Sequence, residues 1–270
     1  NDGLAGSDSC VSVTRLSETI TINGGGLTGL SLAIALRKHG VDVTLHEAGT
    51  YPRHRVCGEF ISGVSRETLE TLGIADAFMD AKYHRGVAWF SGNDHLRDNL
   101  LPEPALAISR HLLDDRLQKS ATALGVNLQT KSRRQMISKA PGEVWTAGRK
   151  PAKGKWIGLK AHVRGINPKA QLEMHSGPLG YLGVTAVEDG WFNVCGLFRM
   201  RRDIDARHEE LLPAYLSKNG NTEIARRIST AEWREGSFTA VAGFALGLQA
   251  TTPGMLSLGD SHAIIPPFTG

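Results

Sequence analysis

A glycine-rich turn near the beginning of the chain carries the first chemical signal. Residues 24–29 read Gly-Gly-Gly-Leu-Thr-Gly, which matches the spacing GxGxxG, and the acidic Glu47 follows at the end of the next apolar segment. In such a turn the first glycine permits a tight change of direction, the second lets backbone amides approach a pyrophosphate, and the third lets a helix press against a sheet. Gly24, Gly26 and Gly29 hold these places. The motif therefore predicts a dinucleotide site.

The donor amides of a helix and the acceptor side chain of Glu47 would complete that site. The helix that starts at Leu27 and Thr28 would point its N-terminal amides at the phosphates. Glu47, with Ala48 beside it, would accept hydrogen bonds from a ribose diol, and its charge would repel a 2′-phosphate. On the glycine turn and Glu47 alone, both FAD and NAD are open as the ligand.

The elements that must position these residues can be predicted from periodicity. Apolar side chains recur at helical spacing from Leu27 to Leu36, and Gly40 can end that helix. The alternation from Val41 to Leu45 is typical of a strand, as is the segment before Gly24. Together they predict a β-α-β unit. The remaining elements are predicted as helices at 65–72, 110–124 and 209–218, and as strands at 86–96, 126–130, 157–163, 171–175, 181–187, 191–197 and 255–258, the last of them buried.

Composition limits the class of protein. The chain has 270 residues, 41% of them hydrophobic, and a net charge of only +4, which suits a soluble globular protein with a sizeable core. Its basic clusters lack interleaved aromatic residues, so we expect no nucleic-acid partner. The three cysteines show no CxxC spacing and the histidines no metal-binding pattern, so we expect a cytoplasmic protein without disulfides or a metal.

Two segments, 1–18 and 236–259, lack the sequence pattern of a signal peptide or a transmembrane helix. Residues 1–18 are polar and acidic, unlike a signal peptide, and are predicted to be a disordered leader. The uncharged segment 236–259 contains Gln249, Pro253 and several glycines, which favours two strands and a turn over a transmembrane helix. Peripheral contact with a membrane is left open, as is the oligomeric state.

Three further motifs give the chain a family resemblance. They are the basic loop 51–59 ending in Cys57-Gly58-Glu59, the helix start Ile108-Ser109-Arg110, and the segment 258–270 with its Gly259-Asp260 pair. With the glycine turn, they resemble the FAD-dependent oxidoreductases of the p-hydroxybenzoate hydroxylase fold, especially their geranylgeranyl-reductase-like branch. The resemblance implies an α/β fold in which a GxGxxG FAD-binding domain accompanies a discontinuous, mainly antiparallel substrate domain. It favours FAD over NAD as the bound cofactor, with NAD(P)H as a possible transient electron donor.

The resemblance also suggests roles for single residues. Arg110 would offer donors to phosphate or ribose oxygens, although pairing with Asp114 one turn later is the alternative. Asp260, next to Gly259, would accept hydrogen bonds from the ribityl chain or cap a helix. Arg55 would face the pyrophosphate or lie in solvent, and these two readings are equally supported.

Two residues are candidates for catalysis. Cys57 would lie near the flavin, where a neutral thiol can donate a proton or shape the substrate pocket; the alternative is a small buried apolar residue. Tyr181 matches the tyrosine of a Gly-Tyr-x-Trp-x-Phe-Pro stretch in the reductases. The Trp and Phe-Pro positions are instead Gly183 and Thr185-Ala186, which argues against a long prenyl substrate. The WxWxIP motif of flavin halogenases is absent.

The expected protein is an FAD-dependent oxidoreductase that acts on a small organic or isoprenoid-like substrate. Its FAD-binding domain is predicted from residues 19–83, 104–156 and 251–270, and its substrate domain from 84–103 and 157–250. Monooxygenation and double-bond reduction both fit. Relatives continue past the Gly-Asp motif into a helix at the flavin, so we expect a chain shortened at its C-terminus. The alternatives are a non-catalytic FAD-binding protein and an NAD-dependent dehydrogenase.

Overall fold

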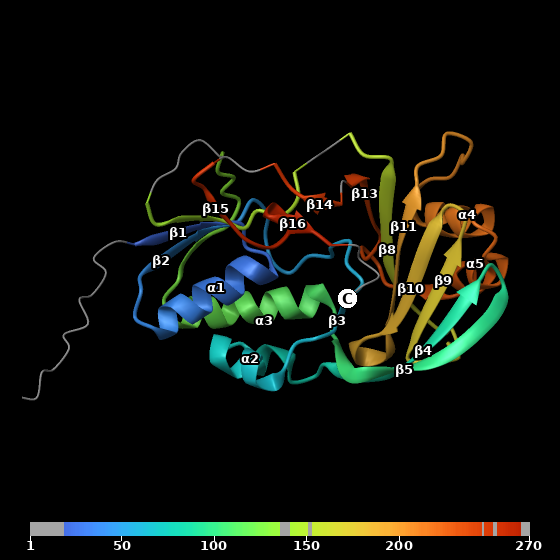
Figure 1. Ribbon diagram of the computed structural model, residues 1–270, viewed down its shortest axis with the longest axis horizontal. Helices are drawn as coiled ribbons and strands as arrows, with labels where there is room; N and C mark the ends of the chain where they lie inside the picture. The colour runs from blue at the N-terminus through green and yellow to red at the C-terminus, as the bar shows by residue number, and fades with distance from the viewer. Residues whose placement is uncertain (1–18, 136–140, 151–152, 245, 251–252, 266–270) are drawn as a thin grey trace, which may run out of the picture.

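The computed structural model describes residues 19–265 except 136–140, 151–152, 245 and 251–252. The predicted leader at 1–18 lies outside the described residues. Two sheets lie side by side along the length of the molecule, and helices cover a face of each (Figure 1). The junction between the two sheets is therefore the place where distant parts of the chain meet.

The first sheet is the dinucleotide-binding type that the glycine turn predicts. Its five strands are parallel and lie in the order β15-β7-β1-β2-β6. Helices α1 and α3 lie next to each other against this sheet, with α2 beside them (Figure 1). Its elements are β1 (Ile20–Asn23), α1 (Leu27–Lys38), β2 (Val43–His46), α2 (Arg66–Leu72), α3 (Arg110–Ala123), β6 (Asn127–Gln129), β7 (Glu143–Trp145) and β15 (Leu256–Ser257).

Local sequence explains where these helices begin and end. Gly40 has a φ of +76°, which stops α1 at the predicted place because a left-handed residue cannot continue the helix. The hydroxyl of Ser109 accepts a hydrogen bond from the Leu112 amide at 3.1 Å and so caps α3. Arg110 is thereby fixed as the first residue of α3, at the end that points toward the second sheet (Figure 1).

The second sheet is larger and mixed. Its strands lie in the order β12-β8-β11-β10-β9-β4-β5-β3, and β13 also pairs with β8. The described pairs are antiparallel apart from β4 with β9. The strands are β3 (Phe60–Ile61), β4 (Lys82–Ser91), β5 (Asp94–Ala107), β8 (Trp156–Arg164), β9 (Leu172–Gly177), β10 (Gly180–Ala186), β11 (Phe192–Arg199), β12 (Glu232–Trp233) and β13 (Thr239–Phe244).

Short elements complete the fold. Helices α4 (Leu211–Lys218) and α5 (Thr222–Ser229) cover the face of the second sheet that points away from the first. Strands β14 (Gly247–Leu248) and β16 (Ala263–Ile264) pair with each other. The 3₁₀ turns are η1 (Ala75–Phe78), η2 (Glu188–Gly190), η3 (His208–Glu210) and η4 (Gly259–Ser261).

Period-two alternation gives the strands of the second sheet two different faces. Leu159, Ala161 and Val163 of β8 are fully buried in the core beneath α4 and α5. The intervening Lys160 and His162 must point to the opposite face, toward the first sheet. They too are fully buried. This polar face is therefore covered by other parts of the chain.

Three details differ from the sequence-based expectation. The prediction of one continuous strand at 86–96 is wrong. A tight turn at Gly92 and Asn93 separates β4 from β5, and Gly92 has a φ of +57°. Helix α5 was not predicted. The buried strand at 255–258 is reduced to β15, in which Leu256 is 56% exposed. That strand lies at the sheet edge, where it has one neighbour instead of two. The predicted α/β class is confirmed, and the division into two domains stays a prediction.

Candidate cofactor and substrate site

The glycine turn connects β1 to α1, and two of its glycines are closely packed against backbone atoms. A Cβ on Gly24, whose φ is +117°, would lie 2.4 Å from the Cα of Ala147. A Cβ on Gly29 would lie 1.9 Å from the carbonyl oxygen of Gly24. These two positions exclude a side chain because the backbone itself fills the space.

Gly26 is different, and its surroundings fit a phosphate group. The nearest atom to a Cβ placed there is Nη2 of Arg110, at 3.9 Å. No side chain caps α1, and its first turn holds no acidic residue, so the amides around Leu27 and Thr28 can meet an anion from outside the protein. The open space, uncapped amides and nearby guanidinium are the donor set that the pyrophosphate of FAD requires.

Glu47 follows β2 and is almost fully buried. Its Oε2 accepts from the amide of Gly25 at 2.9 Å, and its Oε1 accepts from the amide of Gly49 at 2.7 Å and from Arg53 Nη2 at 2.8 Å. The carboxylate therefore holds the glycine turn and the following loop together. A carboxylate has about four acceptor positions. Arg55 Nη2 approaches Oε2 at 3.8 Å, and the neighbouring Ala48 is exposed. The contact of Glu47 with a ribose hydroxyl stays a prediction.

Arg55 and Arg110 meet at one buried carboxylate. Arg55 Nε donates to Oδ2 of Asp114 at 2.8 Å, and Arg110 donates from Nε and Nη2 at 2.8 and 3.0 Å. Arg55 Nη2 also lies 3.5 Å from the carbonyl oxygen of Gly25. The alternative pairing of Arg110 with Asp114 is thus present, and it places both guanidinium groups beside the glycine turn. Their contact with FAD stays a prediction.

The Gly259-Asp260 pair returns to the same place from the other end of the chain. Gly259 has a φ of +60°, and a Cβ there would lie 2.5 Å from Oγ1 of Thr28. Burial raises the pKa of Asp260, while the positive charges of Arg110 and Arg149 oppose that shift. Asp260 therefore lies within electrostatic reach of Arg110, on the side of α1 where the cofactor is expected.

Cys57 lies between the two halves. The amide of Glu59 donates to its Sγ at 3.4 Å, and Asn193 Nδ2 of β11 donates to its carbonyl oxygen at 2.9 Å. Burial lowers the pKa of Arg110, but Asp114 and Cys57 more than compensate, so the net shift is upward. Cys57 is thus near a permanent cation and near the polar face of the second sheet.

Tyr181, the second predicted catalytic residue, has mostly apolar surroundings. It packs with Val87, Leu172 and Met174 on the face of the second sheet that points toward the first. Burial raises the pKa of its hydroxyl, and Cys195 adds to the shift. Burial is the largest cause of the raised pKa of Cys195, and the neighbouring Cys57 raises it further. Cys195 is therefore within electrostatic reach of both candidates, which the fold brings to one region.

The sequence analysis gave no role to a buried polar cluster at this junction. Glu59 lies between Lys160 and His162 of β8, and His54 contacts Lys160 from the basic loop. The signal in the sequence was a lysine and a histidine two positions apart in an otherwise apolar strand. That pattern normally indicates a solvent-exposed face, so the burial of the two residues could not be read from it.

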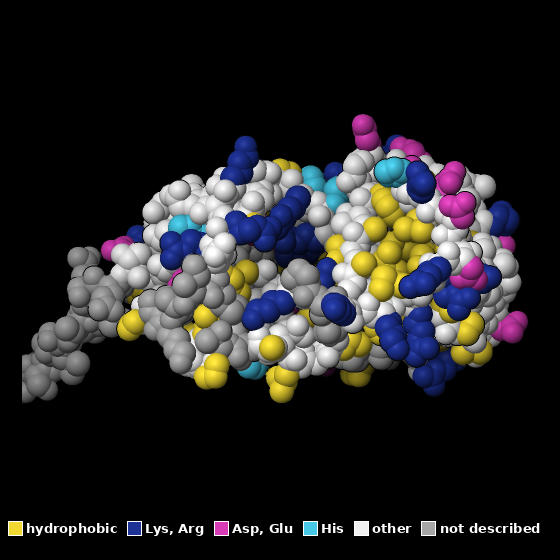
Figure 2. Space-filling view, turned by 90° about the horizontal axis from the view of Figure 1, so that it is seen from above, with side chains coloured by type: hydrophobic (Ala, Val, Ile, Leu, Met, Phe, Trp, Pro, Cys, Tyr) yellow, Lys and Arg dark blue, Asp and Glu magenta, His cyan; other side chains and the backbone are white. Residues whose placement is uncertain are grey.

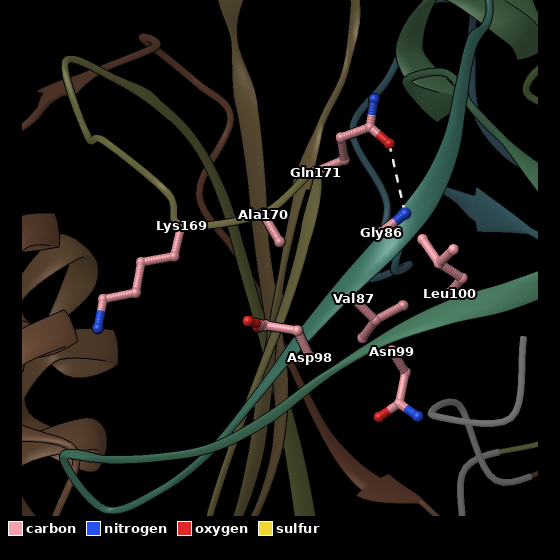
Figure 3. Close-up of a pocket in the computed structure, with 8 residues that line it drawn as sticks. All are labelled: Gly86, Val87, Asp98, Asn99, Leu100, Lys169, Ala170 and Gln171. Atoms are coloured by element: carbon pink, nitrogen blue, oxygen red, sulfur yellow. Dashed lines mark hydrogen bonds between the residues drawn. The ribbon is translucent and has the colours of Figure 1, made fainter.

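The surface of the molecule agrees with this location in one view and shows a separate pocket in another. Lys and Arg side chains gather around the hollowed middle of the molecule, over the junction of the two halves (Figure 2). A separate open pocket of about 390 Å³ is lined by residues of β4, β5 and the segment before β9 (Figure 3). Within it, the Gly86 amide donates to Gln171 Oε1 at 3.4 Å. It contains none of the predicted site residues.

The described residues also bear on a metal site and on a membrane-spanning helix. No group of three His, Cys, Asp or Glu side chains among them could hold a metal ion. Among the helices that the structure describes, none is long and apolar enough to cross a membrane.

Comparison with known proteins identifies the family. The model of the FAD binding domain matches residues 17–161, more than half of the chain, so the protein belongs to this family and FAD is its cofactor. The donor set around Gly26 fits that cofactor. This result excludes the alternative of an NAD-dependent dehydrogenase built on the same glycine turn.

Individual relatives are similar over part of their length. A menaquinone reductase of Mycobacterium tuberculosis is 28% identical over 116 residues, 42% of this chain and 28% of that protein. The protein "Putative FAD-dependent monooxygenase YetM" of Bacillus subtilis is 35% identical over 120 residues, 40% of this chain and 31% of that one. The myxobacterial chondrochloren halogenase CndH, an FAD-dependent halogenase, matches in structure with a TM-score of 0.70 at 16% identity, covering 93% of this chain and 70% of the halogenase. That last likeness concerns the fold alone.

Proposed function

We propose that the protein is an FAD-dependent oxidoreductase whose organic substrate binds between the two sheets. The observation that carries the proposal is the convergence on one place of the open Gly26 backbone, the buried Glu47, and Gly259 from the far end of the chain. The polar cluster around Cys57 and Glu59 lies directly beside it.

Each of these residues has a defined task in that function. The amides at Gly26, Leu27 and Thr28 would hold the pyrophosphate, with Arg110 adding positive charge. Glu47 would orient the adenosine ribose. The bound flavin supplies the redox chemistry, because it takes up an electron pair and passes it on. Cys57 and Tyr181 would face the substrate, as a proton donor and as an apolar wall with one hydroxyl.

We infer that the reaction is the reduction of a substrate double bond. Several proton-bearing side chains lie at the junction, and the likeness to the menaquinone reductase points in the same direction. Hydroxylation of an organic substrate is the second candidate, which the likeness to the monooxygenase YetM favours.

Two titrations test the cofactor assignment. The chain should bind FAD more tightly than FMN, because Glu47 and Gly26 would contact parts of the cofactor that FMN lacks. Saturation with FAD at about 100 times its dissociation constant should raise stability by about 2.7 kcal/mol. Equal or tighter binding of FMN would contradict the assignment.

The reaction class can be separated by oxygen. Addition of NADH or NADPH without oxygen should bleach the flavin absorbance. A reductase then turns over an unsaturated substrate under anaerobic conditions, whereas a monooxygenase consumes oxygen in proportion to product. Flavin that stays oxidised with both donors, although dithionite reduces it, would leave the protein as a non-catalytic flavoprotein, contrary to the proposal.

A further inference from the structure

The polar face of the second sheet buries charged side chains. Lys160 and His162 lie two positions apart on β8 and are both 0% exposed. Cys195 and Asn193 of β11 pair with them across the sheet. A buried lysine requires compensation, since loss of hydration disfavours its charge. The partners of Lys160 therefore show what this face is built to hold.

Glu59 supplies the compensating charge. Its Oε1 lies 3.3 Å from Lys160 Nζ and accepts from the Arg110 amide at 3.0 Å, while its Oε2 lies 2.5 Å from Nε2 of His162. Burial raises the pKa of Glu59, but the hydrogen bond from His162 and the charge of Lys160 lower it overall. With a φ of +53°, Glu59 is held in a conformation that is uncommon for a residue other than glycine. Glu59 and Lys160 therefore form an ion pair, and His162 contacts the other oxygen of the same carboxylate.

His54 connects this buried group to the junction. Its Nδ1 lies 3.1 Å from Lys160 Nζ, and its ring stacks on His111 with centroids 4.6 Å apart. Burial, aided by Lys160, lowers the pKa of His54 to about 3, so the ring is neutral at physiological pH. An ammonium donates to Nδ1, and the proton of the neutral ring is therefore on Nε2. Among the described residues none accepts a hydrogen bond from that Nε2.

We propose that His54 is the group that donates to the oxygen of a conjugated carbonyl substrate, with Lys160 as the proton source behind it. This rests on the proposed oxidoreductase function. A bound reduced flavin would supply a hydride to the far carbon of such a substrate; the electron pair of the double bond would then move onto the carbonyl and leave an enolate or phenolate oxygen. The Nε2–H bond of His54 breaks as the O–H bond forms, and Nδ1 takes a proton from Lys160. Lys160 becomes a neutral amine, and Glu59 and His162 keep it in place.

The same chemistry excludes an isolated alkene as the substrate. A phenolate is about as basic as a tyrosinate, with a conjugate acid of pKa near 10, and an ammonium-backed imidazole can protonate it. An isolated alkene offers no such oxygen, and its carbon is far less basic. The substrate class that this site suits is therefore an enone or a quinone, whose shared feature is the conjugated carbonyl.

Binding of a coloured phenol tests the donor without requiring turnover. We expect the full chain to bind 4-nitrophenolate, titrated by calorimetry at a pH at which the probe is ionised. His54→Phe keeps the stacking ring but removes both nitrogens, and should weaken binding by roughly 10- to 100-fold. His54→Gln keeps one hydrogen-bond donor and should restore part of the affinity for the phenolate. His111→Phe, the matched control, keeps the ring that stacks on His54 and removes nitrogens that make no described hydrogen bond to Lys160, so it should bind like the wild type.

A second measurement does not depend on any variant. In ¹⁵N-histidine-labelled protein, the His54 Nδ1 should be unprotonated and Nε2 protonated from pH 5 to 8. Absent binding of the phenolate, equal affinity in His54→Phe, or the opposite tautomer would each overturn the proposal. If the chain binds no FAD, the oxidoreductase function fails, and the phenolate titration and tautomer still decide the role of His54.

Discussion

At the scale of single residues, Glu47 does more than its motif suggests. The sequence predicts an acceptor for a ribose, whereas the structure shows a carboxylate that already accepts from two amides and one arginine. Hydrogen bonds to a charged acceptor contribute about 1.5–3 kcal/mol each. Glu47 therefore stabilises the glycine turn before any cofactor binds.

Replacing Glu47 separates these two roles. Glu47→Gln should lower the free energy of unfolding by about 1–3 kcal/mol, because the amide turns one acceptor into a donor facing Gly25 or Gly49. FAD affinity should fall by roughly tenfold. Urea unfolding and an FAD titration measure the two effects. Glu67→Gln, on the exposed surface of α2, should change stability by less than about 0.5 kcal/mol. Unchanged stability in Glu47→Gln would mean that the three donors contribute nothing.

At the scale of elements, the β1-α1 turn separates packing from ligand access. Gly24 and Gly29 are glycines because backbone atoms occupy the space of a side chain. Gly26 meets no such atom, and its φ of −83° suits any residue. Only at Gly26 does the absence of a side chain leave space for a cofactor.

This difference gives a matched pair of variants. Gly29→Ala should destabilise the protein by at least about 1–3 kcal/mol, since its Cβ would overlap the Gly24 carbonyl. Gly26→Ala should cost less than about 1 kcal/mol as a poorer helix cap, yet weaken FAD binding by tenfold or more. Urea midpoints and FAD titrations of both variants check this. A Gly26→Ala protein with normal FAD affinity would show that the phosphates lie elsewhere.

At the scale of the whole molecule, packing holds several histidines neutral. Burial is the largest cause of the lowered pKa values of His54, His84 and His111. In the unfolded chain each returns to its ordinary value of 6.5. Below that pH the unfolded chain binds more protons than the folded one, and stability falls as the pH falls.

We expect a loss of stability that begins near pH 6.5, above the range in which carboxylates titrate. Glu59 and Glu173, whose pKa values are lowered by hydrogen bonds that outweigh burial, add a further loss below about pH 4.5. Urea unfolding at pH 8, 7, 6 and 5 measures the profile. His54→Phe should flatten the upper part of this profile. A stability that is constant from pH 8 to 5 would refute the neutral state of these histidines.

Local sequence patterns predict the β-α-β unit, the glycine turn and a dinucleotide site. These depend on spacing over some thirty residues, and local physics decides them: glycine at left-handed positions, apolar residues at helical or strand periods, and an acid after the second strand. The loop 51–59 and Arg110 were also singled out, with the pairing of Arg110 to Asp114 as an alternative, but the binding of Arg55 to the same carboxylate was not predicted.

Which residues share the junction follows from the tertiary fold and not from the local sequence. Glu59 and His162 are 103 positions apart, and His54 and Lys160 are 106 apart. Alternation in β8 tells which side chains share a face, but a buried polar face and a solvated one have the same period. What covers that face depends on how the basic loop packs against a strand formed a hundred residues later, and no local pattern records it.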